Sequence, residues 1–245
     1  MKILLLGLLL CASALPAGAS TMGARDRTCP VCLADFYQRV QISATGSDTG
    51  LDFRPLGAIL TPSPLPVCQE CGFVVLASSA SSRNLTAWRA TAASPEYSAI
   101  KSRSAHYRKA FLYGKLGFGD RGDVGGLYLK ASWEEEEEPA KVKEDLELAL
   151  ANFDAYLAEA AENSVEWGFT HYLRAELLRR LSRFDEAERA LARLRGIKFP
   201  GTGLGRFIKY QRKLCLRKDP APRGIGEMKK ESFFRSIGDF FRRLF

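Results

Sequence analysis

Histidine is scarce in this chain of 245 residues, which contains only His106 and His171. Neither histidine stands at a spacing typical of metal ligands or of a catalytic triad, so we expect both to have surface or packing roles. The sequence also contains no H-x-x-x-H pair, no G-x-S-x-G motif and no phosphate-binding P-loop. The chain therefore lacks the usual sequence signatures of metalloproteases, serine hydrolases and P-loop nucleotide hydrolases.

Long apolar runs are also rare, and the one at the N-terminus is short. Lys2 precedes an apolar run over residues 3–15, which the small residues Ala17 and Ala19 follow. This pattern predicts a secretory signal peptide over residues 1–19, cleaved after Ala19, with an uncleaved anchor as the alternative. No other stretch approaches the roughly 18 apolar residues of a membrane-spanning helix. We therefore expect an exported protein of the periplasm or cell envelope.

The remaining composition is that of an ordinary globular protein, with 46% hydrophobic and 26% charged residues. The net charge of +8 is unevenly spread, because residues 131–170 hold 12 acidic and 2 basic residues, whereas residues 195–245 hold 14 basic and 4 acidic residues. This asymmetry predicts an acidic surface and a basic tail, or two solvated faces that partly neutralise each other. Five glutamates at 134–138, followed by Pro139, predict a solvated helix end and a break.

Two C-x-x-C pairs, Cys29 with Cys32 and Cys68 with Cys71, are separated by 35 residues, and Gly72 follows the second pair. Two residues between cysteines let both sulfurs reach one ion from a tight turn. Two such knuckles complete a tetrahedral four-sulfur shell, which favours zinc. A shell of four protein ligands is closed, so we expect the zinc to be structural. Because an exported protein meets an oxidising compartment, disulfides among these cysteines are the alternative.

Residues 81–216 show the apolar period of amphipathic helices. Residues 180–187 resemble the inter-helix turn of a tetratricopeptide repeat, with Ala175 and Ala187 at the small positions and Phe184 at the aromatic position. An ordinary helical hairpin is the alternative interpretation. Cys215 stands on an apolar stripe and is expected in the core. The other stripes comprise Leu146, Leu150, Phe153, Leu157 and Ala160; Phe169, Leu173, Leu177 and Leu181; and Phe184, Ala187, Leu191 and Leu194.

The last region is a basic tail rich in phenylalanine, set off by Pro220 and Pro222. Its apolar residues recur at helical spacing between lysines and arginines. A basic amphipathic helix of this kind either lies on an anionic membrane surface or docks its aromatic side chains onto the helical region. The predicted contact residues are Phe233, Phe234, Ile237, Phe240, Phe241 and Leu244.

These patterns divide the chain into four regions. They are a signal peptide over residues 1–19, a zinc-ribbon-like head over 20–80, a helical repeat-like domain over 81–216 and the basic amphipathic tail over 217–245. Short β-type runs, such as residues 35–42, occur only in the head. We therefore predict an α+β fold that is mainly α, with a small zinc-ribbon-like N-terminal head followed by tetratricopeptide-like antiparallel helices.

The order of these motifs resembles that of a bacterial family catalogued as domain of unknown function 2225. The likeness rests on the two knuckles, on LYLKASW at residues 127–133 and on AELLRRLSRFDEA at residues 175–187. The resemblance covers about residues 29–195 and implies a zinc-ribbon-like head and a tetratricopeptide-like body. It implies no known activity and no catalytic residues. The signal peptide and the phenylalanine-rich tail depart from the family's usual form and argue against a cytoplasmic role.

Together these inferences predict a non-enzymatic zinc-binding protein, a scaffold or adaptor of the bacterial cell envelope, whose helical region binds a protein or peptide partner. A zinc-ribbon nucleic-acid-binding protein is the alternative, which the net positive charge favours. The basic cluster lies in the C-terminal part and not around the knuckles, which argues against nucleic-acid binding by the head. The signal peptide also argues against a nucleic-acid partner. An enzyme that uses the C-x-x-C thiols is the least favoured class.

Overall fold

The structure is a computed structural model, which describes residues 20–76, 82–162, 164–197, 201 and 203–228. It is 53% helical and 15% strand, with two small antiparallel sheets preceding the helices. This confirms the α+β, mainly α prediction. The predicted signal peptide and the six predicted contact residues of the tail lie outside the described residues.

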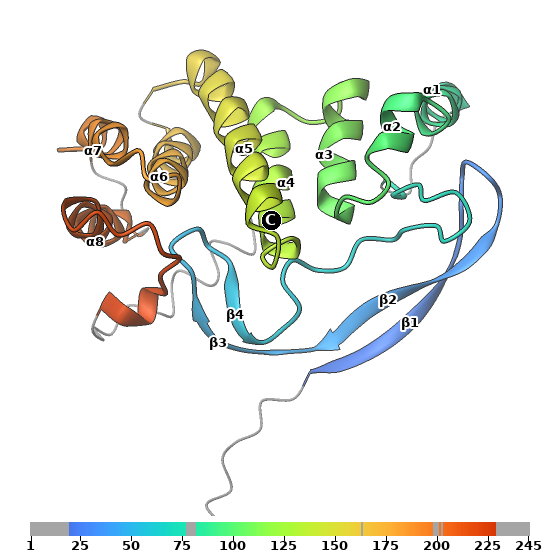
Figure 1. Ribbon diagram of the computed structural model, residues 1–245, viewed down its shortest axis with the longest axis horizontal. Coiled ribbons are helices and arrows are strands. Elements are labelled where there is room, and N and C mark those ends of the chain that lie inside the picture. The colour runs from blue at the N-terminus through green and yellow to red at the C-terminus, as the bar shows by residue number, and fades with distance from the viewer. Residues whose placement is uncertain (1–19, 77–81, 163, 198–200, 202, 229–245) are drawn as a thin grey trace, which may run out of the picture.

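The N-terminal part forms two separate β-hairpins. Strand β1 (Thr21–Thr28) pairs with β2 (Asp35–Ser43), and β3 (Thr45–Thr49) pairs with β4 (Pro55–Ala58). In β2 the buried Phe36 precedes Tyr37, which is 71% exposed, because successive side chains of a strand point to opposite faces of the sheet. Figure 1 shows the β1–β2 ribbon running beneath the row of helices from the side of α1, with β3 and β4 on the side of α8.

The helices follow the hairpins and succeed one another in chain order across the molecule (Figure 1). Side-chain caps explain several of their starts, because Ser94, Ser104, Asp120 and Ser164 each accept a backbone N–H of the first turn. The described elements are α1 (Ser82–Ala92), α2 (Pro95–Ala99), α3 (Ala105–Leu116), α4 (Arg121–Glu134), α5 (Pro139–Glu159), α6 (Val165–Arg180), α7 (Phe184–Arg193), α8 (Leu204–Leu216) and the 3₁₀ helix η1 (Ile225–Met228).

The described residues form two hydrophobic clusters. The larger is built mainly by helices α3–α8 and includes Leu51 and Phe53 from the loop between β3 and β4. The smaller encloses Cys29 and Cys68 and includes Trp88 of α1 together with residues of α2 and α3. Residues 20–80 thus contribute to both clusters. The packing therefore crosses the boundary predicted at residue 80, and the cysteine region is packed against the helices.

Helices α6 and α7 occupy the segment for which we predicted a repeat-type hairpin. Ala175 and Ala187 are both 0% exposed, and Ser182 makes the turn between the helices with a φ of 61°. Small residues at such positions let two helices approach closely. An ordinary hairpin has the same features, so the tetratricopeptide interpretation stays a prediction. Cys215 is 3% exposed within the larger cluster, which confirms its predicted place in the core.

The glutamate run at 134–138 is only partly the solvated helix end that we predicted. Glu135 is 6% exposed, and Nε of Arg103 donates to its two carboxylate oxygens at 3.0 and 3.3 Å. Glu134 accepts the backbone N–H of His106 at 3.0 Å. The prediction is wrong for Glu135 because its partner lies 32 residues away, just before α3. Pro139 does start α5, as the predicted break requires.

Candidate metal centre

The first C-x-x-C pair occupies a tight turn between β1 and β2. The backbone N–H of Cys29 donates to the carbonyl of Ala34, and the N–H of Leu33 donates to the carbonyl of Cys29, both at 2.9 Å. These two hydrogen bonds fold the chain back on itself, so that the side chains of Cys29 and Cys32 reach the same point. Leu33 takes a left-handed conformation, with a φ of 65°, to complete the turn.

The second pair repeats this backbone pattern. The N–H of Cys68 donates to the carbonyl of Phe73 at 3.0 Å, and the N–H of Gly72 donates to the carbonyl of Cys68 at 2.9 Å. A β-bridge between Val67 and Val74 closes the turn, and Gly72 has a φ of 73°. Glycine adopts this left-handed conformation without steric cost, which explains Gly72 directly after the second pair. The two knuckles are equivalent in backbone but differ in the residue at the left-handed position.

The two turns bring all four cysteines together. Sγ of Cys29 lies 3.6 Å from Sγ of Cys71, Sγ of Cys32 lies 3.6 Å from Sγ of Cys68, and the four sulfurs all lie within 4.8 Å of one another. Tetrahedral zinc bound at about 2.3 Å would separate its sulfur ligands by roughly 3.8 Å. The separations are well beyond the roughly 2.05 Å of a disulfide, and all four cysteines are free. The cluster therefore fits one shared metal ion and is consistent with zinc.

Burial differs among the four thiols. Cys29 and Cys68 are 0% exposed, whereas Cys32 is exposed. Burial raises the pKa of the Cys29 and Cys71 thiols, while a backbone hydrogen bond from Ala34 lowers the pKa of Cys32. Buried thiols with raised pKa values keep their protons unless a cation replaces them. Metal binding at this cluster would therefore release protons and would be weakened at low pH.

The second knuckle is firmly attached to the helices. The carbonyl of Gly72 accepts hydrogen bonds from the Tyr97 hydroxyl at 3.1 Å and from Arg108 at 2.7 Å. The same hydroxyl accepts the N–H of Val74 at 3.1 Å. Phe73 is 0% exposed, and its ring packs near those of Trp88 and Tyr97. These anchors lie on α1, α2 and α3, too far along the chain for the sequence pattern to reveal them.

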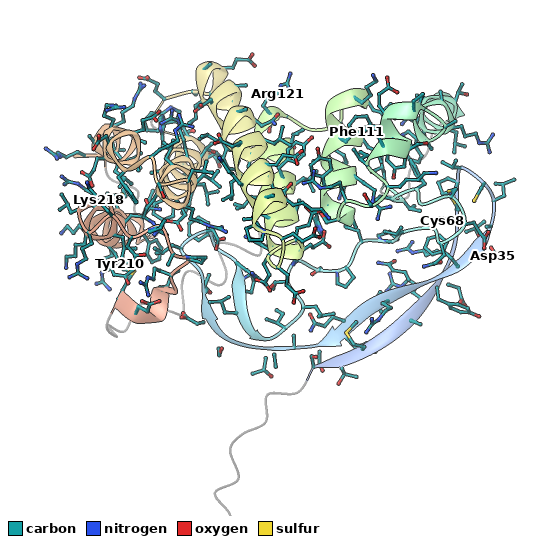
Figure 2. All side chains as sticks on the ribbon, in the orientation of Figure 1. Asp35, Cys68, Phe111, Arg121, Tyr210 and Lys218 are labelled. Carbon is teal, nitrogen blue, oxygen red and sulfur yellow. The ribbon has the colours of Figure 1, made fainter. Side chains whose placement is uncertain are left out.

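The first knuckle has a weaker link to the helices. Arg89 of α1 donates to the carbonyl of Pro30 at 3.4 Å, and Leu33 at the end of the turn is 67% exposed. Figure 2 shows Asp35, the first residue of β2, beside Cys68 at one end of the molecule. The two knuckles meet at their sulfurs, so an ion bound there would join them.

A cleft of about 1020 Å³ lies elsewhere, between the β3–β4 hairpin, helices α4, α5 and α6, and residues 220–227. Asp52 forms part of its wall and accepts hydrogen bonds from Trp133 Nε1 at 2.8 Å and from Arg180 at 2.9 Å. Arg54 pairs with Glu136 across the same cleft. These charged groups neutralise one another, so the walls offer hydrogen bonds and apolar contacts. Sequence reasoning missed this cleft because widely separated segments build it.

Comparison with known proteins adds no assignment, because no family model, curated protein or solved structure matches the chain. The resemblance drawn from the motif order therefore stays a prediction. Among the described residues, no helix is both long enough and apolar enough to span a membrane.

Proposed function

We propose that Cys29, Cys32, Cys68 and Cys71 bind one structural Zn²⁺ in a non-enzymatic scaffold or adaptor protein of the bacterial cell envelope. The observation that carries the zinc site is the approach of four sulfurs to within 4.8 Å of one another. A four-thiolate tetrahedral shell favours zinc and leaves no coordination position for a substrate. The ion would join the weakly attached first knuckle to the second, which α2 and α3 hold in place.

Binding of a peptide or protein segment in the cleft is the proposed interaction. Its volume of about 1020 Å³ is at the upper end for small-ligand pockets. Paired charges such as Arg180 with Asp52, beside apolar residues such as Leu181, suit a polypeptide that presents both kinds of group. Location in the envelope rests on the predicted signal peptide, and membership of the resembled family rests on the order of its motifs.

Metal and thiol content test the zinc site. Protein purified without a chelator is expected to contain one zinc per chain, measured by inductively coupled plasma mass spectrometry. Cys32→Ser and Cys71→Ser variants are expected to lose the zinc. Cys215→Ser is the matched control, because Cys215 is buried in the larger cluster and should not affect metal content. Wild-type protein that lacks metal and contains disulfides among the four cysteines would overturn the proposal.

Site-specific crosslinking tests the cleft. A photoreactive residue in place of the exposed Lys143, which lines the cleft, should crosslink to a partner protein in envelope fractions. The same residue in place of the exposed Lys213 of α8 is the control and should give no such product. Equal products at both positions, or none at Lys143, would exclude the cleft as the interaction site without affecting the zinc result.

A further inference from the structure

A second cleft, of about 370 Å³, lies between helices α5, α6 and α7. Its charged lining consists of Asp154 from α5, Arg174 from α6, and Arg189 and Arg193 from α7. The spacing explains the convergence, since Arg189 and Arg193 are one helical turn apart and share a face of α7. Three guanidinium groups against one carboxylate give the lining residues a net charge of +2, before the carboxylates of Glu162 and Glu186 beside the cleft are counted.

The arginines are only partly engaged by the protein. Arg174 pairs with Asp154 through Nε, and its two terminal nitrogens make no hydrogen bond within the described part of the chain. Arg189 forms no hydrogen bond or ion pair with any described residue, although its charge helps to lower the pKa of Glu186 on the same helix. Arg193 pairs with Glu162 at 3.2 Å, but their side chains are 61% and 67% exposed, so solvent and ligands compete for this contact. Guanidinium donors are therefore available to a bound anion.

His171 adds a buried polar group to the same cleft. It is 5% exposed, its ring centroid lies 4.2 Å from that of Trp167, and its Nδ1 has no hydrogen-bond partner among the described residues. Burial, and then the charges of Arg193 and Arg174, lower the pKa of His171 to about 4. The imidazole is therefore neutral at pH 7. A buried nitrogen left without a partner beside a cationic cleft is a feature that a ligand would complete.

We propose that this cleft binds a phosphate monoester. Arginine forms bidentate hydrogen bonds to phosphate oxygens, and a monoester carries a charge of about −1.5 to −2 at pH 7, which matches the charge of the lining. A single carboxylate would leave about half of that charge uncompensated. The volume exceeds that of the phosphate group alone and leaves space for its organic part against the apolar residues Leu157 and Ala190. The site goes beyond the proposed zinc and cleft functions and depends on neither.

Titration calorimetry and NMR on the full, metal-loaded chain test this site with inorganic phosphate and glycerol 3-phosphate. We expect saturable binding of glycerol 3-phosphate, a shift of the His171 imidazole resonances and a rise in the His171 pKa, since a bound anion favours the imidazolium. The double variant Arg189→Ala with Arg193→Ala should weaken binding at least tenfold. The control double variant Arg195→Ala with Arg217→Ala removes the same charge from exposed positions outside the cleft and should bind within twofold of wild type.

A short phosphoserine peptide distinguishes the source of the monoester, because tighter binding than glycerol 3-phosphate would assign it to a phosphorylated protein side chain. Weaker binding of the peptide would assign the cleft to a free small molecule. Equal affinity for acetate or succinate would overturn the assignment to phosphate. Equal weakening in both double variants, or no saturable binding by the wild type, would overturn the site. Zinc content measured on the same samples separates any such failure from failure of the proposed metal centre.

Discussion

At the residue scale, the two cysteine knuckles differ at the position that takes the left-handed conformation. Gly72 occupies it in the second knuckle with a φ of 73°, and Leu33 occupies it in the first with a φ of 65°. Glycine adopts this region without steric penalty, whereas a side chain with Cβ loses about 1–2 kcal/mol there. Leu33 is 67% exposed and therefore gains little from packing in return.

Exchanging these residue types should move stability in opposite directions. Leu33→Gly is expected to raise the free energy of unfolding by about 0.5 kcal/mol, because relief of the strain exceeds the added entropy of the unfolded chain. Gly72→Ala is expected to lower it by about 1–2 kcal/mol through backbone strain. A Cβ at Gly72 would meet only Lys101, at ordinary contact distances of 3.6–3.7 Å. Denaturant unfolding of metal-loaded protein measures both changes; destabilisation by Leu33→Gly would contradict the equivalence of the knuckles.

Asp145 provides a pH-dependent test at the same scale. It is 0% exposed, and burial, followed by the charge of Glu135, raises its pKa to about 8, although Arg103 opposes this shift. Between about pH 4 and pH 8, the folded state therefore keeps a proton on Asp145, whereas the unfolded state, with a pKa near 3.8, releases it. Stability from this group is present at low pH and is lost as the pH rises from about 4 to about 8.

The variant Asp145→Asn isolates this effect because asparagine does not titrate. The stability of the wild type relative to the variant should fall across pH 4–8, with a slope approaching about 1.4 kcal/mol per pH unit. Urea unfolding at several pH values, followed by circular dichroism, gives the difference. A difference that is flat with pH, or one that rises, would show that the buried carboxyl is ionised in the folded protein.

At the element scale, a buried ion pair within helix α6 also makes hydrogen bonds to the C-terminal part of the described chain. Arg179 is 0% exposed and Glu176 is 1% exposed, and their side chains meet at 2.6 Å. Gln211 of α8 donates to Glu176 at 2.9 Å, and Arg179 donates to the carbonyls of Asp219 and Ala221. This contact holds α6, α8 and residues 219–221 in one arrangement beside the cleft.

Removing one partner should be far more damaging here than at an exposed pair of the same spacing. Arg179→Ala leaves Glu176 as an unpaired buried carboxylate and is expected to lower the free energy of unfolding by about 3–5 kcal/mol. Arg183 pairs with Glu186 at the same i,i+3 spacing, with side chains 38% and 37% exposed. Arg183→Ala should therefore change stability by at most about 1 kcal/mol. Equal losses in thermal or denaturant unfolding would show that burial does not control the strength of these pairs.

Sequence periodicity predicted helices where apolar residues repeat on one face, as for Leu146, Leu150 and Phe153 in α5. The spacing of the cysteines predicted the cluster because two local turns determine the positions of the sulfurs. Contacts between distant segments could not be predicted from such patterns. Asp52 binds Trp133 and Arg180, which lie 81 and 128 residues further along the chain. The larger cleft depends on contacts of this kind, so it became visible only in the structure.

At the scale of the whole molecule, the N-terminal hairpins extend beneath the row of helices, and the chain then returns to the second knuckle (Figure 1). The smaller hydrophobic cluster surrounds the cysteines, whereas the larger cluster of α3–α8 contains none of the four proposed ligands. Metal binding should therefore stabilise one end of the molecule much more than the other.

Removal of the metal should loosen the smaller cluster selectively. After chelation, hydrogen exchange is expected to accelerate in β1, β2, α1, α2 and residues 65–76, because the first knuckle loses its main link to the second. Helices α5, α6 and α7 should keep their protection, since the larger cluster is unchanged. Mass spectrometry of peptides with and without chelator measures this pattern. Uniform acceleration across both clusters would contradict a local structural role for the metal.

The proposed metal centre consists of four cysteine thiolates that share one zinc ion. X-ray absorption at the zinc edge, on wild-type protein purified without added metal, tests it most directly. We expect four sulfur ligands at about 2.3 Å and no nitrogen or oxygen ligand. A first shell containing nitrogen or oxygen, or a protein without zinc whose cysteines are joined in disulfides, would contradict it.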